Sequence, residues 1–178
     1  KGEIGQNLGQ FDWVVSAIPA QQAAQLWPQD TSFNTKVKSA KMKGCFTLML
    51  GFEARLPLDY QAALVRGEDI SWISVNSSKP DRNSATSLLV HSTNGWATQH
   101  DGLDRNEALQ YLLKQTSLVM GQDVNHADPK AVHQWRYANC SKRTCETYFI
   151  DHASRSGACG DWLTQGRVEA PFTRGDYI

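Results

Sequence analysis

The chain has no excess of charge of either sign and no long hydrophobic run. Its 178 residues include 18 Lys and Arg against 18 Asp and Glu, so the formal net charge at pH 7 is zero. Such a balance gives no electrostatic basis for binding nucleic acid or an anionic membrane. The longest apolar stretches, around residues 11–19 and 45–52, are far shorter than the ~20 residues that cross a bilayer. We therefore expect no nucleic-acid partner and no membrane association.

Cysteine is also sparse, and its spacing does not indicate a metal site. Cys45, Cys140, Cys145 and Cys159 are too few for a disulfide scaffold, which favours reduced thiols and a cytoplasmic location. The segment between Cys140 and Cys145 is Ser-Lys-Arg-Thr, which gives no zinc-knuckle turn. We expect no bound metal. A thiol or zinc protein built on these cysteines is an alternative that elemental analysis would test.

Each end of the chain predicts a strand followed by a helix. Residues 11–19 form a nearly continuous apolar run, typical of a parallel strand that is buried on both faces. Helix-forming residues follow at 20–27 and stop at Pro28. Near the other end, residues 157–162 predict a short strand and a tight turn, after which a helix can begin at Val168. These two steps indicate an α/β portion.

The middle of the chain predicts a largely antiparallel sheet. Residues 45–52 are too apolar for a surface strand and are placed centrally, while 70–76 and 86–91 pair antiparallel across a turn. Residues 131–138 alternate and predict a further strand, and 148–150 predict a short one. The clearest helix begins after Asp104, which can cap it, and ends at Gly121. The expected class is α+β with a mixed sheet and flanking helices.

Segments at both ends resemble the flavin-dependent amine oxidase superfamily. The run from Phe11 to Ala23, with its Ala-x-Pro turn, is similar to the strand and turn that pass close to the flavin in that family. Cys159-Gly160-Asp161-Trp162, followed by Gly166-Arg167-Val168-Glu169-Ala170, resembles the family's Gly-Asp motif and the helix after it. Between them, residues 72–80, 91–96 and 133–138 are similar to segments of the renalase-like branch, in the same order.

The resemblance implies an FAD-dependent oxidoreductase of two domains. Segments 1–20 and 156–178 would belong to a Rossmann-like FAD-binding domain, and 21–155 would form the substrate-binding domain. Renalase-like enzymes are associated with hydride transfer from dihydronicotinamide isomers of NAD(P)H to FAD, with oxygen reoxidising the flavin. The implied partner is therefore a small-molecule substrate, a dihydronicotinamide or an amine.

The resemblance also carries over a set of cofactor-binding residues. They are Ala17, Pro19, Gly160, Asp161, Arg167, Val168, Glu169 and Ala170. A carboxylate at a strand end can accept hydrogen bonds from ribityl hydroxyls, while the preceding glycine lets the backbone approach closely. The N–H groups that begin the next helix suit the pyrimidine oxygen of a reduced, anionic flavin. Pro171 is compatible with the first turn of that helix but removes one amide.

The same resemblance gives candidates on the substrate side. His91 and Trp135 are the catalytic candidates, with His91 at a strand end and Trp135 as a wall that stacks on a planar substrate ring. Alternation places Trp135 and Arg136 on opposite faces of their strand. Trp72, Asn76 and Arg136 are the substrate-binding candidates. Core packing for the tryptophans, a solvated His91 and ion pairing for Arg136 are the ordinary alternatives.

One motif of the family is missing. The Gly-x-Gly-x-x-Gly sequence that brings a diphosphate to a helix N-terminus is absent, since Gly2, Gly5 and Gly9 have the wrong spacing and precede a strand. We therefore expect the residues that bind the FAD diphosphate to lie in a missing N-terminal half. We also expect this chain alone to bind FAD weakly or not at all and to be inactive. The alternative is a stand-alone, non-catalytic binding module derived from the substrate domain.

Overall fold

The computed structural model describes residues 9–82, 85–140 and 146–163. The chain divides into two units, one formed by Lys1–Met42 with Cys140–Ile178 and the other by Lys43–Asn139. We call them the terminal unit and the central unit and describe each by itself. The predicted division into 1–20 with 156–178 and 21–155 stays a prediction, because the units are defined by packing and not by what they bind.

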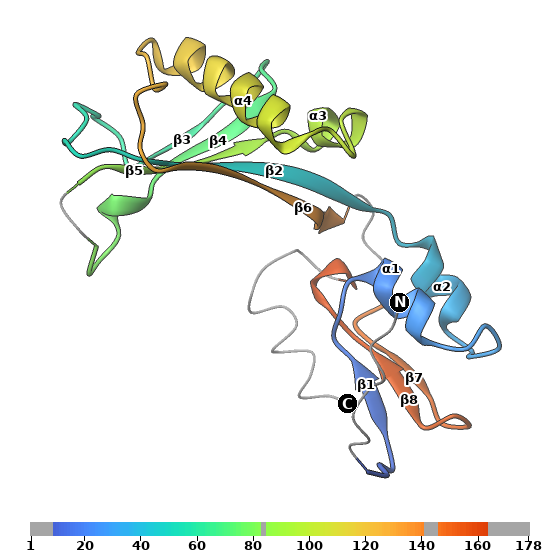
Figure 1. Ribbon diagram of the computed structural model, residues 1–178. Coiled ribbons are helices and arrows are strands. Elements are labelled where there is room, and N and C mark those ends of the chain that lie inside the picture. Colours follow the sequence, from blue (N-terminus) through green and yellow to red (C-terminus); the bar gives the residue numbers. More distant parts are fainter. Residues whose placement is uncertain (1–8, 83–84, 141–145, 164–178) are drawn as a thin grey trace. The chain divides into compact units, whose positions relative to one another are not determined.

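The central unit is built on a five-stranded sheet in the order β3-β4-β5-β2-β6 (Figure 1). The strands are β2 (Met42–Gly51), β3 (Ala62–Leu64), β4 (Ile70–Val75), β5 (Ser87–Ser92) and β6 (Lys130–Cys140). The predicted central place of the second strand is confirmed, since β2 lies between β5 and β6. The predicted antiparallel pairing of β4 with β5 is confirmed as well. A short 3-10 helix, η1 (Asn76–Ser78), follows β4.

The pairing of β2 with β6 can be followed from both ends of the strands. The Gly51 N–H donates to the Pro129 carbonyl at 2.8 Å, and the Gly51 carbonyl accepts from the Asp128 N–H at 2.9 Å. Earlier on β2, Gly44 lies beside the carbonyl oxygens of Trp135 and Arg136. The two strands therefore run antiparallel.

Helices α3 (Asn94–Gln99) and α4 (Arg105–Met120) cover one face of this sheet (Figure 1). The Asp104 side chain accepts hydrogen bonds from the Asn106 and Glu107 N–H groups, and Gly121 ends the helix at φ 65°. Both predicted ends of α4 are confirmed. The core between helices and sheet includes Phe46, Leu48, Leu50, Ile73, Leu88, Val90, Trp96, Leu112 and Leu113.

Apart from the 3-10 helices, three elements were missing from the sequence prediction: α2 (Asn34–Ser39), α3 and β3. Helix α3 begins after Thr93, its N-cap, whose side chain accepts from the Trp96 N–H at 3.1 Å. The burial of Trp96 and Ala97 in the core stabilises this short helix in spite of its glycine. Strand β3, with 3 residues, and helix α2, with 6, are also short and lack a periodic pattern.

The terminal unit contains a three-stranded sheet in the order β1-β8-β7, with α1 (Ala20–Leu26) and α2. Its strands are β1 (Val14–Ser16), β7 (Phe149–Asp151) and β8 (Ser156–Ala158), and the 3-10 helix η2 (Asp161–Leu163) follows. The predicted parallel character of the first strand is confirmed, since β1 pairs with β8 in parallel. None of the described helices combines the length and apolarity that a membrane span needs.

The expected burial of the first strand on both faces is wrong in this structure. Phe11, Val14 and Val15 are 67%, 49% and 44% exposed, whereas Ser16 is buried. Within the described part of the sheet β1 pairs with β8 alone, so one of its edges has no neighbouring strand. The core of the terminal unit instead collects α1, α2, Phe149 and Trp162.

Candidate functional site

The face of the central sheet opposite α3 and α4 carries most of the predicted substrate-side residues, and we call it the open face. Thr47 on β2 pairs with His91 on β5, and His91 pairs with Trp72 on β4. Residues directly opposite in an antiparallel pair point to the same face. Trp72, His91 and Thr47 therefore form a row across three strands.

The row continues onto β6. The contacts of Gly51 and Gly44 with β6 set the register of the two strands and place His133 opposite Thr47. The next residue toward the start of β6, Val132, packs against the core under the helices. Alternation then turns His133 and Trp135 to the open face. Their rings meet edge to face with centroids 4.5 Å apart. The open face thus brings together both catalytic candidates, His91 and Trp135, and one substrate-binding candidate, Trp72.

Two tryptophans of this face are unusually accessible. Trp135 is 54% and Trp72 is 39% exposed, whereas Trp96 on the covered face is only 4% exposed. Core packing is therefore not what holds Trp135 in this chain. An exposed indole offers a flat apolar surface on which a planar ring can stack.

His91 and Cys45 form a pair at the centre of the open face. Cys45 Sγ lies 3.8 Å from His91 Nδ1 and also contacts the backbone carbonyls of Phe46 and Ser92. Burial lowers the pKa of His91. Burial also raises the pKa of the Cys45 thiol, an effect that Ser92 and Thr47 partly oppose through hydrogen bonding. Both groups are therefore neutral near pH 7, which argues against a thiolate nucleophile.

Next to this row the open face is hollowed into an apolar groove of about 390 Å³. Met49 from β2, Leu89 from β5 and Ala131 from β6 contribute side chains to its walls, and Asn76 from η1 lies at its border. Asn76 is the one substrate-binding candidate that lines this groove. Arg136 is exposed and, by alternation from Trp135, projects from the covered side of the sheet.

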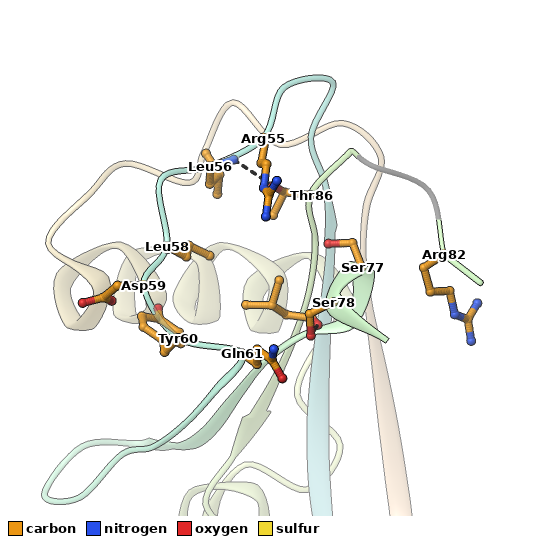
Figure 2. Close-up of a pocket in the computed structure, with 11 residues that line it drawn as sticks. Arg55, Leu56, Leu58, Asp59, Tyr60, Gln61, Ser77, Ser78, Arg82 and Thr86 are labelled. Atoms are coloured by element: carbon orange, nitrogen blue, oxygen red, sulfur yellow. Dashed lines mark hydrogen bonds between the residues drawn. The ribbon is translucent and has the colours of Figure 1, made fainter. Parts of the chain in front are cut away.

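A second cavity, of about 460 Å³, lies where the segment before β3 meets η1 (Figure 2). The Leu56 N–H donates to Thr86 Oγ1 at 2.8 Å across it, and Ser77 and Ser78 line it from η1. Figure 2 shows the Arg82 side chain pointing away from the other lining residues. The groove of the open face is the better candidate because it adjoins the row that contains His91, whereas the larger cavity is lined by none of the predicted site residues.

The predicted cofactor-binding residues Ala17, Pro19, Gly160 and Asp161 lie around the β1–β8 pair of the terminal unit. The Cys159 N–H donates to the Ser16 carbonyl, which brings the two segments side by side. A Cβ at Gly160 would lie 2.7 Å from Cδ1 of Trp162, whose Nε1 donates to the Ile18 carbonyl at 3.1 Å. Packing of Trp162 is thus sufficient reason for a glycine here.

Asp161 is half-buried at the start of η2. Among the described residues no hydrogen-bond partner of its carboxylate was found, so its oxygens are available to the hydroxyl groups of a ligand. The remaining predicted cofactor contacts, Arg167, Val168, Glu169 and Ala170, lie outside the described residues, as does the helix predicted from Val168.

Thr47, Cys45 and His133 were not among the predicted site residues. Each sits in a strand pattern that core packing or surface exposure explains equally well. The only signal in the sequence was that Cys45 and Thr47 share one face of a strand whose other face is wholly apolar. Cys145, which the zinc alternative needs, lies outside the described residues, and the described ones contain no group of three or more metal-ligating side chains.

The fold of the chain is shared by several solved structures. The chain superposes on a protein from Exiguobacterium sp. 255-15 assigned as a protoporphyrinogen oxidase, with a TM-score of 0.63, 16% identity and 93% of the chain covered. For a redesigned putrescine oxidase the TM-score is 0.67, with 11% identity and 92% coverage. For a protein from Pyrococcus furiosus it is 0.56, with 11% identity and 92% coverage.

Residues 2–160 match the family model described as flavin containing amine oxidoreductase, so the chain belongs to this family. It spans 41%, 42% and 38% of the three matched structures' own lengths. The chain therefore corresponds to well under half of each of these proteins.

Proposed function

We propose that this chain is the C-terminal part of an FAD-dependent, renalase-like oxidoreductase that transfers hydride from a small substrate to flavin. The central unit would supply the substrate pocket, and the terminal unit would supply the last flavin-binding segment. The family match and the fold support the flavin chemistry. A dihydronicotinamide or an amine as substrate, and a cytoplasmic location supported by the free thiols of Cys45 and Cys159, are parts of this proposal.

The observation that carries the proposal is the open face. Two exposed indoles, Trp72 and Trp135, accompany the neutral His91 and Cys45 pair beside an apolar groove. Such a surface suits a planar, poorly charged ring better than a phosphate or a carboxylate. Trp135 would hold the ring by stacking, and His91 would give or accept a hydrogen bond without changing its charge.

The terminal unit has groups that fit a flavin in part. The carboxylate of Asp161, for which the described residues provide no hydrogen-bond partner, suits sugar-like hydroxyls, and the backbone near Ala17 and Pro19 adjoins it through the parallel β1–β8 pair. FAD, when bound, would supply the acceptor for the hydride. The exposed edge of β1, with Val14 and Val15, supports the idea that further residues of a longer protein extend this sheet.

The test compares the full reading frame that contains this chain with the chain itself. We expect the longer protein to bind FAD and its absorbance to bleach faster with dihydronicotinamide isomers than with ordinary NADH. Isothermal titration of the 178-residue chain should show weak FAD binding or none.

Trp135→Phe in the longer protein should slow bleaching by up to about tenfold, since one aromatic contact is worth roughly that much. Leu118→Ala, which removes an exposed side chain from α4, is the matched control and should leave the rate unchanged. Tight stoichiometric FAD binding by the chain alone would contradict its fragment character. A natural start codon at this chain, with ligand binding but no flavin, would favour the non-catalytic module.

A further inference from the structure

The groove of the open face is produced by small residues on its three strands. The register of β2 with β5 pairs Met49 with Leu89 and Gly51 with Ser87. The contacts that place His133 opposite Thr47 also place Ala131 of β6 opposite Met49. Glycine, alanine and serine side chains take up little room above the sheet. A volume of about 390 Å³ is therefore left open beside the larger side chains of Met49 and Leu89.

A proline ring forms a wall at the end of the groove that lies away from His91. A Cβ at Gly51 would lie 2.8 Å from Cδ of Pro129, so the ring packs directly over the glycine. The hydrogen bond from the Gly51 N–H to the Pro129 carbonyl, at 2.8 Å, holds the two residues together. Ser87, which also lines this end, follows His91 at a distance of about 13 Å along β5, since a strand rises about 3.3 Å per residue. The groove is therefore an extension of the row that contains His91.

The lining of the groove offers little to an anionic group. Among the described residues that line it, Lys130 is the one that carries a charge. Its Nζ donates to the Asn125 carbonyl at 2.8 Å, and alternation along β6 starts its side chain from the covered side of the sheet. The neighbouring cavity, of about 400 Å³, carries three acidic residues, Glu53, Asp81 and Asp128, against one basic residue. A phosphate or carboxylate is therefore disfavoured in the groove, whereas an apolar chain would lose contact with water and gain apolar neighbours.

We propose that the groove is a subsite for an unbranched apolar chain attached to the ring that lies on the row of His91, and that Ala131 keeps this subsite open. The inference rests on the proposed function for the idea that the open face binds substrate. It adds which substituent the substrate carries, because a nucleotide would place a sugar and phosphates after the ring, which this lining does not suit. One turn of an α-helix, about 10 Å wide and about 5.4 Å long, would already exceed the 390 Å³ of the groove. A small-molecule chain therefore fits this space better than a protein segment.

The test uses the 178-residue chain and pyridines that carry a methyl, propyl or pentyl group in the meta position. Binding is followed by NMR, in which the Met49 methyl reports on the chain of the probe and the Trp135 indole N–H reports on its ring. Met42 and Met120, which do not line the groove, are internal references. Affinity should rise by up to about fourfold for each methylene, the value of burying it. A propyl chain that ends in a carboxylate should bind more weakly than the propyl group.

Ala131→Phe fills the groove from an exposed strand position that tolerates an aromatic residue. It should abolish the dependence on chain length and leave the affinity of the methyl probe unchanged. Ala62→Phe is the matched control, because Ala62 is equally an exposed alanine on an edge strand, pairs with Ser74 and does not line the groove. This control should keep the full dependence. Leu89→Asn puts an amide on the wall without filling the groove, and it should weaken the pentyl probe much more than the methyl probe.

Affinities that do not rise with chain length, or a rise that Ala131→Phe leaves intact, overturn the subsite. The inference also fails if no probe shifts the Met49 methyl. If chain length has no effect and Ala131→Phe instead changes the association of the chain in sedimentation, the groove is a contact between copies and the inference is wrong. The proposed function is judged separately, by the flavin bleaching of the longer protein, so a ring that binds without any effect of its chain counts against the groove alone.

Discussion

Replacing Thr47 by valine should make the central unit more stable, although most substitutions in a protein core do the opposite. The change deletes a buried hydroxyl, on a residue that is 3% exposed, for which the described residues offer no hydrogen-bond partner better than the Cys45 thiol. Valine keeps the branched shape and suits the centre of a sheet at least as well as threonine.

The size of the effect follows from the cost of burying a hydroxyl without a partner, which is about 1–3 kcal/mol in proteins. The adjacent Cys45 thiol compensates for part of this cost. We therefore expect the free energy of unfolding to rise by about 1 kcal/mol. Thr116→Val should lower it by about the same amount, because Thr116 Oγ1 loses its bond to the Leu112 carbonyl at 2.6 Å.

The assay is hydrogen exchange at the backbone amides of β2 and β5, because it reports on the central unit alone when the two units unfold separately. A gain of about 1 kcal/mol slows the exchange of the most protected amides about fivefold. The two threonine variants should shift the rates in opposite directions.

Faster exchange in Thr47→Val, similar to that of Thr116→Val, would refute this reasoning. It would mean that the Thr47 hydroxyl has a partner of value inside the fold, for which Cys45 is the available group.

Two further changes test the pair at the open face and the Gly-Asp turn. Burial lowers the pKa of His91, so the unfolded state binds more protons than the folded state as the pH falls. The free energy of unfolding of the central unit should therefore decrease below about pH 6.5. His91→Gln should reduce this pH dependence, measured by urea titrations at pH 7.5 and 5.5. Gly160→Ala should destabilise the terminal unit by about 1–3 kcal/mol, measured by exchange in β8, because the new Cβ would collide with the anchored Trp162 indole. Gly95→Ala in α3, where a Cβ meets nothing closer than 3.9 Å, should be neutral or slightly stabilising; a loss equal to that of Gly160→Ala would contradict the steric account.

The elements that could be predicted are those marked by neighbouring residues in the sequence, such as helix caps and apolar runs. Asp104 and Gly121 bounded α4 because capping and left-handed termination depend on neighbouring residues only. The second strand was placed centrally because its run is apolar on nearly every position. Helix α3 was missed because its stability comes from Trp96 in the core, and no pattern of six residues announces such packing.

The site could be predicted residue by residue but not as a group. His91, Trp72 and Trp135 come from three strands that are distant in sequence, and the registers of β4, β5, β2 and β6 bring them to one face. A shift of any register by one residue would turn its side chains to the covered face. Thr47 escaped notice because its burial and its missing bond are both properties of the folded sheet.

The open face departs from ordinary sheet packing in several ways that are all costly for folding. It buries a hydroxyl at Thr47 whose best described partner is the Cys45 thiol, half-buries an imidazole with a lowered pKa at His91, and leaves the indoles of Trp72 and Trp135 exposed. The covered face of the same strands carries Phe46, Leu48, Leu50, Leu88 and Val90, which follow the rules of a stable core. The same strands form both faces, so a generally low stability of the sheet does not explain why the two faces are packed so differently. Residues that lower stability are concentrated on one face of an otherwise well-packed sheet, which is the pattern expected of a surface selected for binding. Substitutions that stabilise this face should therefore weaken its contacts with a ligand.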